Sequence, residues 1–594
     1  MRATEPATPD VSADLDETPT DLEPPGRWID GVVDWFRRRG PVGRGALALL
    51  LFTCASILVF ALPVMGDLRN RCVGSCLGDT HLYMWSFEWM RYAIAHHQNP
   101  FFTSLIYAPE GMNLGWMTTL PGPALLAVPL TARFGSLFAV NVLMIAAPAL
   151  AGWATYLVCV RVTKRFWPSI AGGAVFAFST YMGQHMRAHL NLVLIFFVPL
   201  AVYLVLRRVD RTMGRILFVV LLGVVLAGQL STSLELAATM TFFGVIAYLG
   251  ALVVAPGPVR MRLLWTAPLV AASYLLAAVV ALPILRNALQ NPPTTEFRIP
   301  TANSIDLLGF VVPSAPARFG GASFAWLTDR FHGLPQDNTG YIGVALLAVA
   351  VLFLVRFRRE LWAWAMVAFM LLIGALALGP KLQIAGAISV WAPQALMAKI
   401  PLIAHALPER FPAYVFLVLA VVTALWLAAG TGRSWWRYTL VAVGVVMMSV
   451  NLAWEPHYHA VDQQPAFFTD GSYQRYLQPD ETVLAVPTLL GGELGWQVAA
   501  DMNFRLARAY VGPVHAAGHE EIGLRPFLSE PGDIMPGADS LRYFLSQRHV
   551  GAVIVEEPVQ PELTALLNDV LGTSPTSVGG VSVWQVPPDV GQAG

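Results

Sequence analysis

The residues of this chain best suited to acid–base chemistry begin with Gly78-Asp79-Thr80-His81, which follows the first long apolar segment, Ala46–Met65. A carboxylate held beside apolar rings could remove a proton from a hydroxyl group and so act as a general base. Aspartate is also a preferred cap at a helix N-terminus, because its side-chain oxygen accepts a hydrogen bond from a free backbone amide. We retain both interpretations of Asp79, which are not exclusive.

A second polar group lies between two later apolar segments. His185, Arg187, His189 and Asn191 occupy alternating positions there. A cation and two imidazoles gathered in one turn could bind a phosphate or a sugar hydroxyl. The alternative interpretation is an ordinary polar loop tip.

Two further charged residues border apolar segments. Glu235 begins one of them, and Arg410, within Pro408-Glu409-Arg410-Phe411-Pro412, precedes another. Charges in such places are costly and are usually paired or functional, and an arginine can hold a phosphate through paired hydrogen bonds. The alternatives are a carboxylate favoured by the helix dipole for Glu235 and an interfacial anchor for Arg410.

The four cysteines divide into two kinds. Cys54 and Cys159 lie within apolar runs, where we expect inert packing residues. Cys72 and Cys76 lie four positions apart in a loop, where they form either a small disulfide outside the cytosol or two free thiols. Because no paired spacing of a zinc site occurs, we predict no metal and no cofactor, and the sequence gives no support for a divalent ion.

The composition indicates the environment of these residues. Hydrophobic residues make up 56% of the chain and charged residues 13%, against roughly 45–50% and about 25% in a soluble domain. The apolar residues occur in long runs nearly free of charge, and about 20 of them cross a bilayer. The formal net charge is zero, which argues against a nucleic-acid partner. We therefore predict a polytopic α-helical membrane protein.

Arginine clusters beside the runs predict its orientation, because basic loops stay in the cytosol. They indicate a cytosolic N-terminus and about eleven crossings. The segment Leu120–Phe134 breaks the alternation, since the charges allow one crossing within 119–160. We predict a re-entrant or interfacial helix there. The clusters are Arg37–Arg44, Arg161–Arg165, Arg207–Arg215, Arg260–Arg262, Arg356–Arg359 and Arg433–Arg437.

The chain divides into three predicted parts. Residues 1–43 form a disordered cytosolic tail, because they contain few large apolar side chains. Residues 44–456 form the membrane domain, with external loops 66–118, 286–338 and 380–412. The first loop mixes aromatic and polar residues, a pattern typical of a helix that lies along the bilayer surface.

Residues 457–594 form a small extracytoplasmic α/β domain. The β-like runs are Val483–Pro487, Gly551–Val555 and Val581–Val586, and the helix-like segments are Asp539–Gln547 and Pro561–Leu571. Gly491-Gly492-Glu493 predicts a turn rather than a phosphate-binding loop.

This pattern resembles the GT-C superfamily of integral membrane glycosyltransferases, especially its uncharacterised bacterial members. The resemblance rests on Gly78-Asp79, His189-Leu190 and Arg410-Phe411, together with the first-loop acid, the many spans and the external C-terminal domain. It covers most of residues 45–590. The family often pairs its first-loop acid with a neighbouring carboxylate, whereas Thr80 and His81 follow Asp79 here, which argues against a paired-acid or metal-assisted version.

The resemblance implies an enzyme of the bacterial plasma membrane. It would move a sugar from a polyprenyl-phosphate donor to an extracytoplasmic glycan or lipid acceptor, with inversion at the anomeric carbon. Asp79 would be the catalytic base, and Arg410 would stabilise the departing phosphate. The residues expected to bind or position the donor are His81, His185, Arg187, His189, Glu235 and Arg410.

Two other functions fit the same topology. A transporter or flippase of lipid-linked glycans should show inverted repeats and broken helices near the bilayer midplane, and the sequence shows no convincing internal repeat. A non-catalytic cell-envelope assembly protein would use the external domain to bind a partner.

Overall fold

The computed structural model describes residues 40–76, 78–290, 303–332, 338–400, 406–430, 435–449, 464–487, 491–511 and 537–588. Residues 1–39 of the predicted disordered tail, which was assigned to residues 1–43, lie outside the described residues. The chain forms two compact units, Met1–Ala48 and Leu49–Gly594. From Leu49 onward, the membrane helices and the C-terminal domain therefore belong to one unit.

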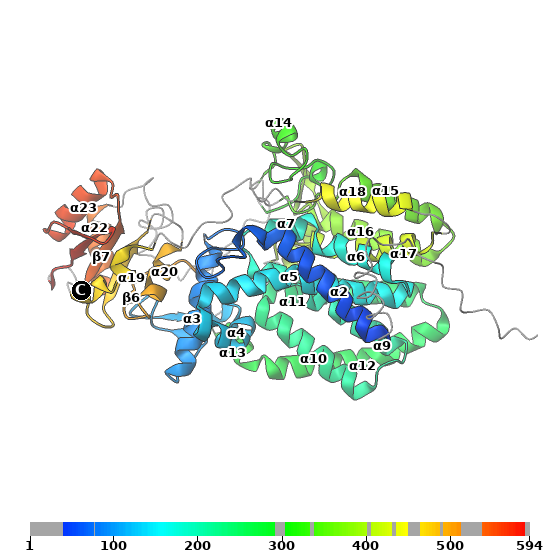
Figure 1. The fold of residues 1–594 in the computed structure, drawn as a ribbon, viewed down its shortest axis with the longest axis horizontal. Helices are drawn as coiled ribbons and strands as arrows, with labels where there is room; N and C mark the ends of the chain where they lie inside the picture. Colours follow the sequence, from blue (N-terminus) through cyan, green and yellow to red (C-terminus); the bar gives the residue numbers. More distant parts are fainter. Residues whose placement is uncertain are drawn as a thin grey trace, which may run out of the picture. The chain divides into compact units, whose positions relative to one another are not determined.

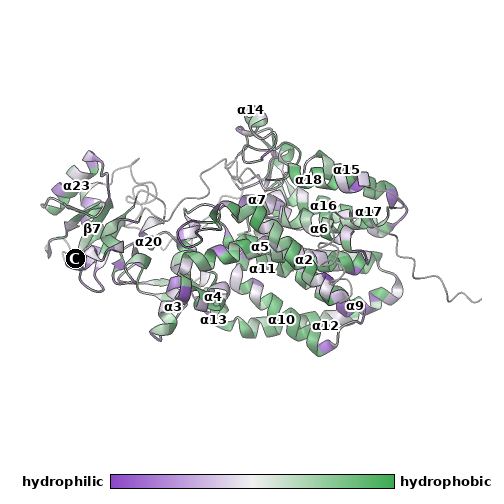
Figure 2. Ribbon diagram, viewed as in Figure 1, coloured by the Kyte–Doolittle hydropathy of each residue, from purple (hydrophilic) through white to green (hydrophobic). Residues whose placement is uncertain are grey.

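Apolar helices dominate this unit, as the hydropathy colouring in Figure 2 shows. Among the described residues, seven helical segments are long and apolar enough to cross a membrane, and four shorter apolar helices accompany them. The long segments contain α2 (Gly40–Ser56), α5 (Ser136–Thr163), α8 (Leu190–Val193) with α9 (Phe197–Val209), α10 (Arg215–Thr232), α11 (Leu234–Val254), α12 (Gly257–Val280) and α17 (Pro412–Ala428). The shorter ones are α6 (Phe166–Ala177), α15 (Val344–Arg356), α16 (Leu361–Ala377) and α18 (Trp435–Met447).

These helices fall on the predicted apolar runs and confirm the polytopic α-helical fold. The segment that broke the charge alternation forms a separate helix, α4 (Pro121–Phe134). It ends at Gly135, whose φ of 91° favours glycine and turns the chain into α5. α4 belongs to neither group of apolar helices.

Helix α3 (Asp79–Ala95) occupies the first external loop and is labelled in Figure 1. It packs against α4 and α5 of the membrane domain and against α20 (Gly492–Ala499) of the C-terminal domain. One face joins the membrane-domain core through Tyr83, Met84, Phe87 and Met90. The opposite face joins the C-terminal core through Leu82, Trp85, Trp89 and Ala93. The predicted helix is confirmed, and protein covers it on two faces.

The C-terminal domain contains a five-stranded sheet in the order β6-β5-β7-β9-β8. β5 is parallel to β6 and β7, whereas β9 is antiparallel to β7 and β8. The predicted runs are confirmed as β5 (Thr482–Val486), β7 (Ala552–Glu556), β9 (Val581–Gln585), α22 (Ala538–Gln547) and α23 (Pro561–Leu571). The sequence analysis did not identify β6 (Arg505–Leu506), β8 (Thr576–Val578) or the short helix α19 (Ala466–Thr469).

Successive side chains of a strand point to opposite faces, and this alternation divides the sheet between two cores. Leu484, Val486 and Trp584 pack against α22 and α23. Val483, Ala485 and Val583 share the core that contains one face of α3. The first external loop also extends the sheet, since Ile106 pairs in parallel with Leu506 of β6. The shared core therefore attaches this domain to α3, and the pairing of Ile106 attaches it to the segment that follows α3.

The other short elements lie in the segments between the apolar helices. They are β1 (Phe102–Thr103), β2 (Met112–Asn113), α13 (Leu282–Gln290), α14 (Ala325–Thr328), β3 (Lys381–Ile384) and β4 (Ala387–Trp391). The carboxylate of Asp306 accepts hydrogen bonds from the amides of Ala385 and Gly386 at 3.1 and 2.8 Å, in the turn between β3 and β4. The second and third external loops are thus joined to each other.

Candidate active site

Asp79 is the first residue of α3. The N-cap is Gly78, which has a φ of 56°, so the interpretation of Asp79 as the cap is wrong. Its carboxylate instead receives a hydrogen bond from outside the helix: the Tyr510 hydroxyl donates to Oδ1 at 2.8 Å. Asp79 therefore faces other elements of the fold rather than its own helix end.

The second carboxylate oxygen of Asp79 has longer contacts. Oδ2 lies 3.4 Å from the Tyr83 hydroxyl and 3.9 Å from His189 Nε2. Tyr83 donates its proton more favourably to Asn191 Oδ1, at 2.8 Å. The side chains of Asp79 and His189 keep 17% and 38% of their surfaces accessible. Oδ2 therefore has weaker hydrogen bonds than Oδ1, and it lies beside the partly accessible imidazole of His189.

His189 comes from the turn between α7 (Thr180–His185) and α8. Ser179 caps α7 through a hydrogen bond from the Met182 amide, and the His189 amide donates to the His185 carbonyl at 2.9 Å. The two imidazoles meet edge to face, with ring centroids 5.3 Å apart. His185 and Arg187 are buried, so the interpretation of this segment as a polar loop tip is wrong.

The surroundings of the two imidazoles keep them uncharged. Burial lowers the pKa of His185 well below its usual value, and the neighbouring His189 ring and the charge of Arg410 lower it further. Burial also lowers the pKa of His189, where Asp79 acts in the opposite direction while Arg410 and Arg187 reinforce the lowering. Among the described residues, His185 Nε2 and His189 Nδ1 are buried without a hydrogen-bond partner. Buried polar atoms that have no partner in the protein commonly form hydrogen bonds with a ligand or a water.

Arg410 forms an ion pair with Glu235, through Nη1 and Oε2. The other Glu235 oxygen accepts a hydrogen bond from the Leu407 amide at 2.8 Å. Only 12% of the arginine side chain and 13% of the glutamate side chain are accessible. Glu235 lies in the first turn of α11, so the helix dipole favours it as well. The interpretation of Arg410 as an anchor at the bilayer surface is wrong, because its charge is neutralised inside the protein.

The charge of Arg410 also reaches the Asp79 group. It acts electrostatically on His185, His189 and Tyr83, and Asp79 acts on Arg410 in turn. Two hydrogen bonds hold the neighbouring residue Glu409 in place. Its backbone carbonyl accepts one from the Thr339 hydroxyl, and its carboxylate accepts the other from the side-chain Nδ2 of Asn303. The start of α3, the α7–α8 turn, the first turn of α11 and the segment before α17 therefore contribute to one site.

His81 is the sequence candidate that the structure separates from the others. It follows Asp79 by two residues, which places it on another side of α3. Its Cβ and ring pack near Gly491 and Gly495 of the C-terminal domain. Asp79, His185, Arg187, His189, Glu235 and Arg410 come together, whereas His81 contacts the domain that covers α3.

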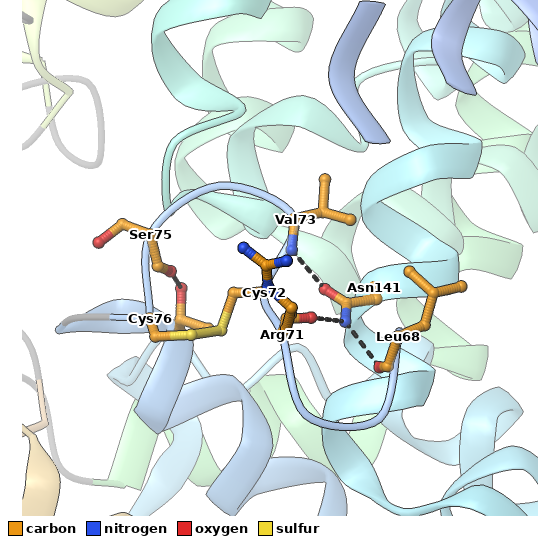
Figure 3. The surroundings of a disulfide bond; sticks show 8 residues. Leu68, Arg71, Cys72, Val73, Ser75, Cys76 and Asn141 are labelled. Atoms are coloured by element: carbon orange, nitrogen blue, oxygen red, sulfur yellow. Dashed lines mark hydrogen bonds between the residues drawn. A yellow bond between two sulfur atoms is a disulfide. The ribbon is translucent and has the colours of Figure 1, made fainter. Parts of the chain in front are cut away.

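A disulfide joins Cys72 to Cys76, with Cα atoms 5.6 Å apart (Figure 3). Asn141 of α5 secures this loop, because its Oδ1 accepts from the Val73 amide at 2.8 Å and its Nδ2 donates to the carbonyls of Leu68 and Arg71. The Thr80 hydroxyl donates to the Ser75 carbonyl at 2.7 Å. The start of α3 and the disulfide loop are thus attached to the same membrane helix.

Two tyrosines of the site were missed by the sequence analysis. Tyr83 lies four residues after Asp79, a spacing that puts both on one helix face and could have identified it. Tyr510 follows Asp79 by 431 positions, and no local pattern marks it. Among the described residues, no group of three or more His, Cys, Asp or Glu side chains could hold a metal ion.

The fold is that of integral membrane proteins of the GT-C type. An oligosaccharyltransferase from Archaeoglobus fulgidus is similar, with a TM-score of 0.51 and 12% identity over 88% of this chain and 69% of that one. The mycobacterial arabinofuranosyltransferase AftD is similar over 91% of this chain and 40% of its own, with a TM-score of 0.55 and 15% identity. At these identities the likeness shows the fold, and it confirms the predicted GT-C architecture.

Residues 49–448 match the family described as a domain of unknown function, DUF6311. The match covers more than half of the chain, so the protein belongs to this family. No curated protein matches the sequence.

Proposed function

We propose that the protein is a glycosyltransferase that moves a sugar from a polyprenyl-phosphate donor to a glycan or lipid acceptor outside the cytosol. The observation that carries the proposal is the position of Asp79 Oδ2, 3.9 Å from the partly accessible His189 ring and within the electrostatic reach of Arg410. A base and a cation in one site are what displacement at an anomeric carbon requires.

In the proposed reaction the acceptor oxygen attacks the anomeric carbon and forms the new glycosidic bond. The bond between that carbon and the phosphate oxygen breaks, and its electron pair leaves with the polyprenyl phosphate. Asp79 Oδ2 takes the acceptor proton. A single displacement inverts the configuration of the anomeric carbon.

The leaving group gains negative charge at its bridging oxygen. Arg410 stabilises this charge with the guanidinium donors that Glu235 does not use, because an arginine carries five N–H groups. His185 and His189 are uncharged, so they bind donor oxygens through hydrogen bonds rather than as cations. Arg187 adds a second positive charge on the same turn.

The test is transfer of a radiolabelled sugar from a panel of synthetic polyprenyl-phosphate sugars by the full-length protein in nanodiscs. The variant is Asp79→Asn, and Asp67→Asn in the same external loop is the matched control. We expect transfer by the wild type and the control, and a loss of about a hundredfold or more for Asp79→Asn if the base contributes as general bases usually do.

The opposing outcomes discriminate between functions. Equal transfer by Asp79→Asn and the wild type removes Asp79 from the mechanism. If no donor and acceptor support transfer, but liposomes containing the protein move the labelled lipid across the bilayer, the flippase interpretation replaces the enzyme.

A further inference from the structure

The two oxygens of Asp79 are held differently, and this difference comes from the C-terminal domain. Oδ1 accepts a 2.8 Å hydrogen bond from Tyr510. Oδ2 lies 3.4 Å from Tyr83 and 3.9 Å from His189, both longer than an ordinary hydrogen bond to a carboxylate. Because the two oxygens of a carboxylate are equivalent, a strong donor on one of them, Oδ1, fixes the plane of the group and leaves the other, Oδ2, facing His189.

Tyr510 is itself fixed from both sides along the chain. Its amide donates to Glu493 Oε1 at 2.5 Å, and the carbonyl of the preceding residue, Ala509, accepts from the Tyr107 hydroxyl at 3.0 Å. Glu493 is buried and lies in the first turn of α20. The backbone at Tyr510 is therefore attached to α20 and to Tyr107.

The prediction of a turn at Gly491-Gly492-Glu493 is wrong for the last two residues, because α20 begins at Gly492 and Gly491 is its N-cap. Gly491 has a φ of 83°, a conformation that residues other than glycine rarely adopt. A Cβ at Gly491 would lie 3.2 Å from the Gly78 carbonyl and 3.5 Å from the Tyr510 ring. Gly491 thus lies directly against both the residue before Asp79 and the ring that binds Asp79.

The phenol remains a donor under all physiological conditions. Burial raises the pKa of Tyr510, and the neighbouring Asp79 carboxylate raises it further. A tyrosine that keeps its proton cannot take the acceptor's proton, so its hydrogen bond to Oδ1 serves to orient the carboxylate.

We infer that Tyr510 is a positioning residue of the Asp79 site, supplied by the C-terminal domain and held by Glu493, and that it makes Oδ2 the oxygen that receives the acceptor proton. The inference rests on the proposed function. It assigns to the C-terminal domain a role in the chemical step.

The kinetic test compares Tyr510→Phe with Tyr473→Phe in the full-length protein. Tyr473 is a matched control, since it is buried in the same domain and its hydroxyl donates a single bond, to the Ala500 carbonyl at 3.3 Å. We expect kcat of Tyr510→Phe to fall about tenfold to a hundredfold, the loss that a misplaced reacting group produces, while KM for the donor stays unchanged. Equal kcat values for the two variants would overturn the inference.

Glu493→Ala tests the support of the ring. It should lower kcat in the same way, and the double variant Glu493→Ala/Tyr510→Phe should be no slower than Tyr510→Phe alone, because both changes act through one hydrogen bond. Multiplicative losses in the double variant would contradict this route.

A substrate-free measurement separates this inference from the proposed function. In a double-mutant cycle of thermal unfolding, Tyr510→Phe should lower the Tm of the wild type but change the Tm of Asp79→Ala less, since the partner is already absent. Additive Tm shifts would contradict the Tyr510–Asp79 contact. If the Tm shifts of Tyr510→Phe and Asp79→Ala are not additive but neither the wild type nor any variant transfers sugar, the Tyr510–Asp79 contact stands. In that case the proposed reaction is removed, and with it the role of Tyr510 in the reaction.

Discussion

The amide of Ser75 donates a hydrogen bond to the carbonyl of Arg187 at 2.5 Å. Ser75 lies inside the Cys72–Cys76 disulfide loop, and Arg187 lies in the sequence between His185 and His189, whose imidazoles contact each other. The same loop binds Thr80, the residue after Asp79. One small loop therefore determines the spacing between the candidate base and the polar turn opposite it.

Loss of the disulfide should loosen this loop. We expect Cys72→Ser/Cys76→Ser to lower stability by about 2 kcal/mol, the chain-entropy value for so short a loop, and to reduce transfer activity several-fold. Thermal unfolding and sugar transfer in nanodiscs measure the two effects. Cys54→Ser is the control, because Cys54 is an exposed free thiol.

Gly74→Ala provides an independent change in the same loop. Gly74 has a φ of 89°, and a Cβ there would lie 2.3 Å from the Arg187 carbonyl oxygen. It should therefore impair transfer with the disulfide intact. Wild-type activity in both loop variants would show that the loop does not position the turn.

The Glu235–Arg410 pair should be important for stability. Glu235→Gln leaves a buried guanidinium without its counter-charge, and breaking such a pair by removing one partner costs about 3–5 kcal/mol. The matched control is Asp210→Asn, which breaks the 2.8 Å Arg161–Asp210 pair, where 47% of the aspartate side chain is accessible. An exposed pair contributes about 0–1 kcal/mol.

Thermal unfolding of the purified variants checks this difference. Addition of Arg410→Gln to Glu235→Gln should restore part of the lost stability, since the unpaired charge is then gone. Equal Tm losses for Glu235→Gln and Asp210→Asn would show that the pair is no more than a surface contact.

Acid should destabilise the protein through His185. Its pKa in the folded protein lies well below the ordinary 6.5 because of burial, so the unfolded chain binds a proton that the folded chain does not. The stability from neutral His185 is therefore fully present above about pH 6.5 and is lost as the pH falls towards the folded-state pKa.

The measurement is the Tm between pH 5 and pH 8. We expect His185→Gln to flatten the decline on the acid side, whereas His97→Gln, which changes an exposed residue of the first external loop, keeps it. Parallel Tm curves for wild type and His185→Gln would contradict the buried neutral imidazole.

The sequence by itself determined the membrane helices and most of the larger elements of the C-terminal domain. Runs of apolar residues predicted the membrane helices, and the strand-like and helix-like runs of residues 483–586 predicted β5, β7, β9, α22 and α23. These patterns are local, because the periodicity of a helix or strand is written in a few consecutive residues. The same locality allowed Asp79, His189 and Arg410 to be identified at the ends of apolar segments.

Only the tertiary structure decided which of these residues meet. Glu235 pairs with Arg410 across 175 positions and Tyr510 binds Asp79 across 431, and no local pattern relates them. It also decided that α3 is covered on both faces and that His81 faces the C-terminal domain. The physical reason is that a residue's own helix sets the direction of its side chain, whereas the neighbour it finds there depends on how distant segments pack.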